Sequence, residues 1–134
     1  MRDDIAEALI PGTHGSTFGG NPLAMAVGNC VMDIVNKVDF LSNVEKNGLF
    51  FKNQLDKLCE KYPNVIAEIR GLGLMIGIKC SVANNLLANK LYENGILTVN
   101  AADNVIRILP PLNITMSEIK KVMSLFEKSI KEIL

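Results

Sequence analysis

Apolar residues recur at intervals of three and four along much of the chain, which is typical of helices with one apolar face. The pattern predicts a short helix near the N-terminus, ended by Pro11-Gly12, and then four longer helices. The longer helices lie over about residues 21–37, 40–61 and 82–93 and from Thr115 onward. Asn21-Pro22 is a strong helix start, because asparagine caps a helix and proline fits its first turn.

Capping residues and short apolar runs complete the pattern. Ser42–Glu45 and Thr115–Glu118 both have capping-box spacing, and Ser81 is placed to cap the helix after it. Four apolar runs predict strands, at about residues 65–70, 74–79, 96–99 and 105–109. After the short N-terminal helix, the order of two helices, two strands, one helix, two strands and a final helix predicts an α+β domain. We expect a small antiparallel or mixed sheet that is covered by helices and preceded by a glycine-rich loop and a long helix.

Composition narrows the class of protein. The chain has 134 residues, of which 49% are apolar, so it suits one globular domain and is too apolar for intrinsic disorder. Its 14 basic and 14 acidic residues balance, which argues against nucleic acid or an anionic membrane as the main partner. No CxxC pair exists and His14 is the only histidine, so no metal site is predicted. The acidic N-terminus does not resemble a signal peptide, and we expect a cytoplasmic protein with reduced, mostly buried cysteines.

The segment from His14 to Pro22, HGSTFGGNP, is the strongest candidate for a binding site. Its glycines allow the backbone to approach a ligand closely, and Ser16 and Thr17 add two hydroxyl donors. The helix after it adds free amides and the positive end of its dipole, so the segment suits a phosphate or a carboxylate. The alternative interpretation is a flexible loop before a capped helix, because the segment lacks the lysine and the spacing of a P-loop.

Two further motifs have competing interpretations. Arg70–Gly77, RGLGLMIG, is a poor dinucleotide fingerprint, because its glycines have the wrong spacing and a strand comes after them. The favoured interpretation is a tight crossing between strands, where glycines avoid a clash with a neighbouring element. Arg107 shares one face of its strand with Val105 and Leu109. It either pairs with an anionic group in a partly buried position or points outward from an edge strand.

Three motifs in order resemble the C-terminal portion of the class-III aminotransferases that depend on pyridoxal 5'-phosphate (PLP): PGTHGSTFGGNPLAMAVG, RGLGLMIGI and VIRILPPLNIT. HGSTFGGNPLA is most similar to acetylornithine aminotransferases and their ornithine-handling relatives. The similarity covers nearly the whole chain from Pro11 onward. It implies the small C-terminal domain of a PLP-transferase of aminotransferase fold type I over residues 21–134, preceded by a cofactor-phosphate loop in residues 1–20.

The resemblance also implies a role for three residues. The hydroxyl that matches Thr17 binds the phosphate of the PLP held by the other subunit of a dimer, and the residue that matches Ser16 lies near the acylornithine substrate. The arginine that matches Arg107 lies near a substrate carboxylate. The implied reaction is amino transfer between N-acetylornithine and 2-oxoglutarate, in arginine biosynthesis.

No catalytic residue is assigned in this chain. In the family, the Schiff-base lysine, the aspartate that binds the pyridine nitrogen and the aromatic residue that stacks on the ring all precede the HGSTFGGN motif. The nearest lysines here, Lys37 and Lys46, lie on predicted helices without the required motif. We therefore expect a C-terminal fragment that is inactive alone, belongs to a homo-oligomer, and has the missing N-terminal catalytic domain or a second subunit as its partner. The alternatives are a non-catalytic binding or assembly module that keeps this fold, and a free-standing phosphate-binding domain.

Overall fold

The computed structural model describes residues 2–8, 10 and 12–134. The chain divides into two compact units, Met1–Lys37 and Val38–Leu134. The predicted division at residue 20 separates the cofactor-phosphate loop from the small domain, and it stays a prediction.

The first unit contains two helices joined by the glycine-rich loop. Helix α1 spans Asp3–Ala6 and α2 spans Pro22–Val35. The predicted start of α2 is confirmed, because Asn21 Oδ1 accepts a hydrogen bond of 2.9 Å from the Ala24 amide. No residue of α2 is buried, so its apolar side chains are uncovered within this unit. No helix in the described part of the chain is long and apolar enough to cross a membrane.

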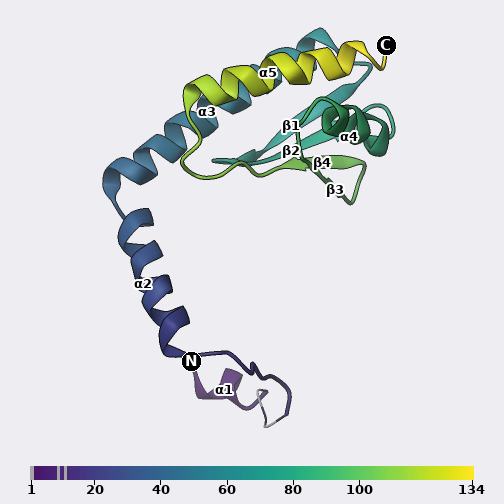
Figure 1. The fold of residues 1–134 in the computed structure, drawn as a ribbon. Coiled ribbons are helices and arrows are strands. Elements are labelled where there is room, and N and C mark those ends of the chain that lie inside the picture. The colour runs from purple at the N-terminus through teal and green to yellow at the C-terminus, as the bar shows by residue number, and fades with distance from the viewer. Residues whose placement is uncertain (1, 9, 11) are drawn as a thin grey trace. The chain divides into compact units, whose positions relative to one another are not determined.

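The second unit is a four-stranded antiparallel sheet with three helices (Figure 1). Its elements, in chain order, are α3 (Val38–Lys61), β1 (Ile66–Leu72), β2 (Met75–Cys80), α4 (Asn84–Glu93), β3 (Val99–Ala101), β4 (Val105–Ile108) and α5 (Met116–Lys131). The strands lie in the order β1-β2-β4-β3. The predicted α+β class, element order and small sheet are therefore confirmed.

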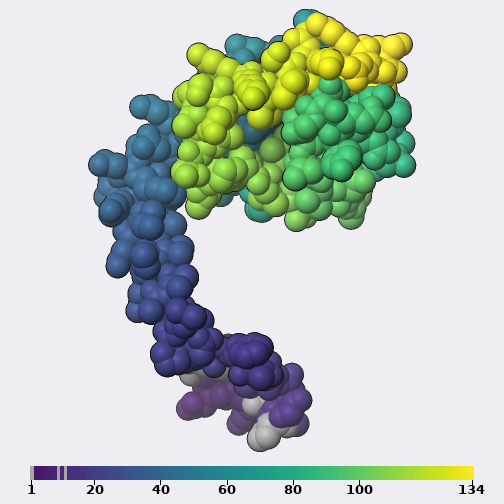
Figure 2. All heavy atoms as spheres, viewed as in Figure 1, coloured from purple at the N-terminus to yellow at the C-terminus, as the bar shows by residue number. Residues whose placement is uncertain are grey.

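One face of the sheet forms the core with all three helices. Strand pairing places Ile69, Ile78 and Ile106 in one row on this face, and each is buried. The helices contribute the large buried side chains Phe51, Leu55, Leu58, Leu87, Leu91, Ile119, Phe126 and Ile130. Helices α4 and α5 also pack against each other, as the green and yellow atoms in Figure 2 show. Helices α3 and α5 each bury one apolar face, as their predicted apolar period requires.

Three local predictions are wrong. Helix α3 begins at Val38, so Ser42–Glu45 lies inside it and caps nothing. Ser81 does not cap α4, because its hydroxyl donates to the Pro63 carbonyl oxygen at 2.7 Å. Strand β3 begins only at Val99.

The cysteines differ from one another in burial. All three are free thiols: Cys80 is buried, Cys59 is half-buried and Cys30 is exposed, so the expectation of general burial is wrong for Cys30. Burial raises the pKa of the Cys80 thiol to about 11, which leaves it protonated and unreactive at neutral pH.

The β1–β2 turn packs directly on α3, and a glycine on the helix makes this possible. A Cβ atom added to Gly48 would lie 2.6 Å from the backbone carbonyl carbon and oxygen of Gly73. Backbone atoms do not move aside as the end of a flexible side chain does, so only glycine allows this approach. The interpretation of RGLGLMIG as a tight turn between strands against a neighbouring element is thereby confirmed.

We predict that Gly48→Ala lowers the free energy of unfolding by about 1–3 kcal/mol, since overpacking forces the helix and the turn apart. Gly28→Ala on α2 is the matched control, because a Cβ there meets no atom within 4 Å. Urea unfolding, monitored by the fluorescence of Tyr62 and Tyr92, measures how each substitution affects the second unit, which contains Gly48 and not Gly28. Equal stability of Gly48→Ala and the parent would contradict the assigned contact.

The C-terminal end of α3 is fastened to α5 through one carboxylate. Lys61 Nζ and Tyr62 Oη donate to Glu127 Oε1 at 2.7 and 2.9 Å, and Lys131 Nζ lies 3.3 Å from the same oxygen. The ammonium of Lys61, then the hydroxyl of Tyr62 and the ammonium of Lys131, lower the pKa of the Glu127 carboxyl to about 2. The charged form is therefore favoured by folding.

This lowered pKa predicts a pH-dependent stability. Glu127 stabilises the fold fully above its unfolded pKa, which is near 4.5, and loses this contribution as the pH falls toward about 2. We expect Glu127→Gln to lower the free energy of unfolding at pH 7 by at most about 1 kcal/mol, because the pair is partly exposed. The difference from the parent should shrink between pH 5 and pH 2. Urea unfolding across this range tests it, with the exposed Glu60→Gln as control, and a difference that does not change with pH would contradict the assignment.

Candidate functional site

Two turns shape the glycine-rich loop and place the two predicted hydroxyl residues. The Gly19 amide donates to the Ser16 carbonyl oxygen at 3.3 Å, so Thr17 and Phe18 occupy the tip of the first turn. The Asn21 amide and side-chain Nδ2 both donate to the Phe18 carbonyl oxygen, at 3.4 and 2.5 Å. The loop thus has a defined backbone path up to the cap of α2.

The hydroxyls of Ser16 and Thr17 are available donors in this loop. Both residues are exposed, and neither side chain forms a hydrogen bond with any residue that the structure describes. A Cβ on Gly19 would lie 2.9 Å from Ser16 Cβ and Oγ, so the Ser16 side chain lies against Gly19. Asn21 satisfies the Ala24 amide, and the two hydroxyls keep their donors available for a ligand.

Arg107 lies on the face of the sheet opposite the helices. It pairs with Gly77 of β2 and Val99 of β3, so β4 is an interior strand and the prediction of an edge strand is wrong. The partly buried alternative is wrong as well, since Arg107 is exposed and has no ion pair with any described residue. The predicted sharing of a face is confirmed for Val105, which is buried but does not belong to the core cluster beneath the helices. It is wrong for Leu109, because β4 ends at Ile108.

Arg107 lines a depression of about 410 Å³ on this open face. Arg70 and Gly77 line it as well, together with Gly71, Met75, Ile76, Ala101, Ala102 and Val105. Beside the depression, Asp103 accepts from Arg70 Nη2 at 3.4 Å and from Lys79 Nζ. These two cations, Lys79 first, lower the pKa of the Asp103 carboxyl. Arg107 is consequently the guanidinium of this face that has no internal carboxylate partner in the described structure.

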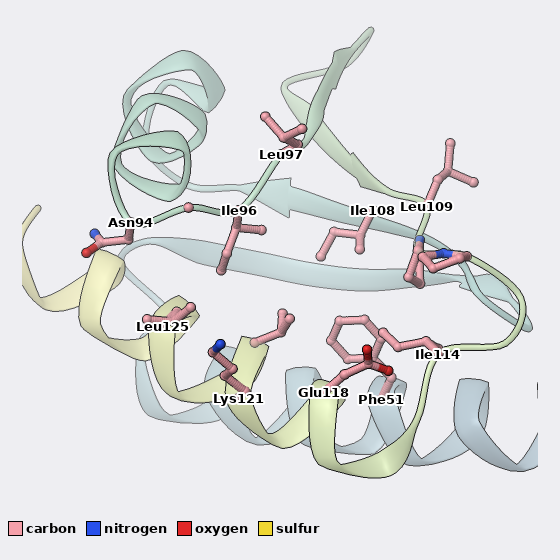
Figure 3. Close-up of a pocket in the computed structure, with 14 residues that line it drawn as sticks. Phe51, Asn94, Ile96, Leu97, Ile108, Leu109, Ile114, Glu118, Lys121 and Leu125 are labelled. Carbon is pink, nitrogen blue, oxygen red and sulfur yellow. The ribbon is translucent and has the colours of Figure 1, made fainter.

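A larger pocket of about 550 Å³ lies elsewhere in the second unit, between the sheet and α5 (Figure 3). Apolar side chains such as Phe51, Ile96 and Ile108 form most of its lining. The Glu118 carboxylate in this lining belongs to the predicted capping box, which is confirmed: it accepts from the Thr115 amide at 2.7 Å. The other polar side chains of the lining are Lys121 and Asn94, and Asn94 already donates to the Lys90 carbonyl oxygen and to Ser129 Oγ.

Sequence patterns did not identify Arg70 or Asp103 as candidate site residues. In the sequence Arg70 is only the first residue of a glycine motif, and its position on the face of Arg107 depends on strand register. Thr17 and Ser16 belong to the first unit and Arg107 to the second. Their predicted cofactor and substrate roles stay predictions.

Comparison with known proteins gives one consistent family. Residues 1–130 match the family described as aminotransferase class-III. The chain is 44% identical over 130 residues to the acetylornithine aminotransferase of Brucella melitensis, which covers 97% of this chain and 32% of that protein. The crystal structure of acetylornithine aminotransferase from Elizabethkingia anophelis matches with a TM-score of 0.80 and 37% identity, covering 98% of this chain and 35% of that one.

An ornithine aminotransferase from Toxoplasma gondii, whose structure reveals partial occupancy of PLP at its active site, matches with a TM-score of 0.78 and 36% identity. The match covers 95% of this chain and 31% of that one. The chain thus spans about a third of the length of the relatives it matches. With the family matching nearly every residue and the fold agreeing with solved members, the chain belongs to the class-III aminotransferases.

Proposed function

We propose that this chain is the C-terminal portion of a PLP-dependent acetylornithine-type aminotransferase, which transfers an amino group between N-acetylornithine and 2-oxoglutarate in arginine biosynthesis. The observation that carries the proposal is the loop of Ser16 and Thr17, which offers two free hydroxyls directly before the capped helix α2. Acetylornithine aminotransferases among the relatives support the choice of substrate.

The loop fits the phosphate of PLP. Thr17 would donate its hydroxyl to a phosphate oxygen, and Ser16, held against Gly19, would lie toward the acylornithine substrate. A hydroxyl that donates to a dianion forms a charge-assisted hydrogen bond, which is stronger than a bond between neutral groups. When bound, PLP supplies the electron sink of amino transfer, while the protein binds and orients it.

Arg107 would bind a carboxylate of the substrate. An arginine without an internal carboxylate partner keeps its planar donor fork available for two parallel hydrogen bonds. Its place on an interior strand of the sheet gives this fork a rigid base.

The Schiff-base lysine would come from a part of the enzyme outside these 134 residues. The chain spans about a third of its relatives, and its own lysines lie in other sequence contexts. We therefore propose that the chain is inactive alone, that the N-terminal catalytic domain or a second subunit completes the site in the cytoplasm, and that PLP phosphate is bound across a homodimer.

We predict that Thr17→Ala weakens PLP binding by about ten- to a hundredfold, since a charge-assisted hydrogen bond contributes about 1.5–3 kcal/mol. The assay uses a chimera in which this chain replaces the matching residues of the Brucella melitensis enzyme. Equilibrium dialysis of PLP measures the loss. Ser16→Ala should instead raise mainly the KM for N-acetylornithine.

Thr17→Ser is the matched control, because it keeps the hydroxyl and removes only a methyl group. It should bind PLP nearly as tightly as the parent chimera. If Thr17→Ala retains PLP as tightly as the parent, the phosphate role is wrong and the loop is only the entry to α2. A chimera that binds PLP but transfers no amino group would favour the non-catalytic module.

The uncovered apolar residues of the first unit predict self-association of the chain when it is studied alone. Phe18, Leu23 and Met25 are 79%, 75% and 52% exposed, and apolar patches of this kind drive association in water. Sedimentation velocity over a concentration series should show oligomers, and Leu23→Ser should weaken them. Leu97→Ser, at a residue 81% exposed in the second unit, should have little effect. A monomer at all concentrations would contradict the prediction.

A further inference from the structure

We infer that Arg70 is a second carboxylate-binding residue of the Arg107 depression, and that Asp103 competes with the ligand for it. The inference rests on the proposed role of Arg107 and extends it to the class of ligand: a short dicarboxylate would be bound at both ends, a monocarboxylate at one.

Strand register places the two arginines on either side of one glycine. Arg70 of β1 pairs with Gly77 of β2, and Gly77 pairs with Arg107 of β4. Residues paired across antiparallel strands point to the same face, so both guanidinium groups rise from the open face. Their backbones lie two strand spacings apart, which is about 10 Å. Two long, flexible side chains can close this span onto a small ligand.

Gly77 forms the floor between them. A Cβ on Gly77 would lie 3.3 Å from Val105 Cγ1 and 3.5 Å from Arg70 Cγ, so the stem of Arg70 and the side chain of Val105 lie directly beside the glycine. The depression of about 410 Å³ exists because this central position has no side chain. Its walls are apolar and its charged groups are the two arginines, which suits a ligand with a short apolar chain and an anionic group at each end.

Asp103 is held in a turn that places its carboxylate against the guanidinium of Arg70. Asp103 and Asn104 form the β3–β4 turn with φ values of 62° and 55°, a left-handed conformation that aspartate and asparagine tolerate. Asn104 Nδ2 donates to the carbonyl oxygens of Cys80 and Val82 at 2.8 and 2.7 Å, and Asn104 Oδ1 accepts from the Asn84 amide at 2.8 Å. These three bonds fasten the turn to the last residue of β2, to Val82 and to the first residue of α4.

The ion pair between Asp103 and Arg70 is weak enough for a carboxylate of the ligand to displace Asp103. The Asp103 carboxylate is shared with Lys79, and its contact with Arg70 is a single one of 3.4 Å between groups that are 61% and 49% exposed. A guanidinium has five N–H donors, so most donors of Arg70 stay available. Asp103 nonetheless reduces the positive charge that a second carboxylate would meet, and removal of its charge should strengthen dicarboxylate binding.

The test compares glutarate with its monomethyl ester, which has the same length and one carboxylate fewer. Binding to the 134-residue chain is measured by NMR titration of the arginine Nε–Hε signals at constant ionic strength. The quantity of interest is the ratio of the two affinities. Asp103→Asn should raise this ratio by up to about fivefold, the range of an exposed charge pair. Arg70→Gln should lower this ratio to the value expected from statistics alone. Glutarate can then present either of its two carboxylates to Arg107, whereas the monoester can present only one.

Glu68→Gln is the control for net charge. Glu68 pairs in register with Lys79 on the same face, so its substitution removes one negative charge without releasing Arg70, and it should leave the ratio unchanged. The inference is overturned if the parent, Arg70→Gln and Asp103→Asn share one ratio, or if Glu68→Gln raises it as much as Asp103→Asn. Arg107→Gln separates this result from the proposed function: unchanged binding of the monoester would refute the role of Arg107, whatever the ratio does.

Discussion

Burial of one isoleucine-rich face of the sheet against α3, α4 and α5 is the interaction on which the second unit depends. Ile69, Ile78 and Ile106 lie in one row across three strands and are almost fully covered. Since side chains alternate along a strand, fixing this face fixes the opposite one too. A shift of register by one residue would bury Arg70 and Arg107 and expose the core, so the packing that stabilises the unit also positions its charged groups.

The same strand register determines which charged side chains lie on the open face of the sheet. Gly77 lies between the two arginines, and Asp103 satisfies Arg70 and Lys79 while Arg107 keeps its donors available. In the first unit, the exposed residues Ser16 and Thr17 carry the two hydroxyls of the glycine-rich loop. Under the proposed function, the loop would contact the phosphate of the cofactor and Arg107 a carboxylate of the substrate.

Local sequence patterns predicted those features that depend on neighbouring residues. The Asn21 cap, the Thr115–Glu118 capping box and the inward face of α5 required only spacing along one helix. Sequence patterns did not predict the features that join residues far apart in the chain. Asn104 bonds to the first amide of α4 from 20 residues away, which removes the need for Ser81 as a cap. Arg70 and Arg107 come together only through the register of three strands, which spacing does not reveal.

The central claim is that these 134 residues supply cofactor and substrate contacts to an active site whose lysine lies elsewhere. The most direct measurement is amino transfer from N-acetylornithine to 2-oxoglutarate, by the chain alone and by the chimera in which it replaces the matching residues of the Brucella melitensis enzyme. The account predicts transfer by the chimera and none by the chain alone. Transfer by the chain alone, or a folded chimera that retains PLP without transferring an amino group, would contradict it.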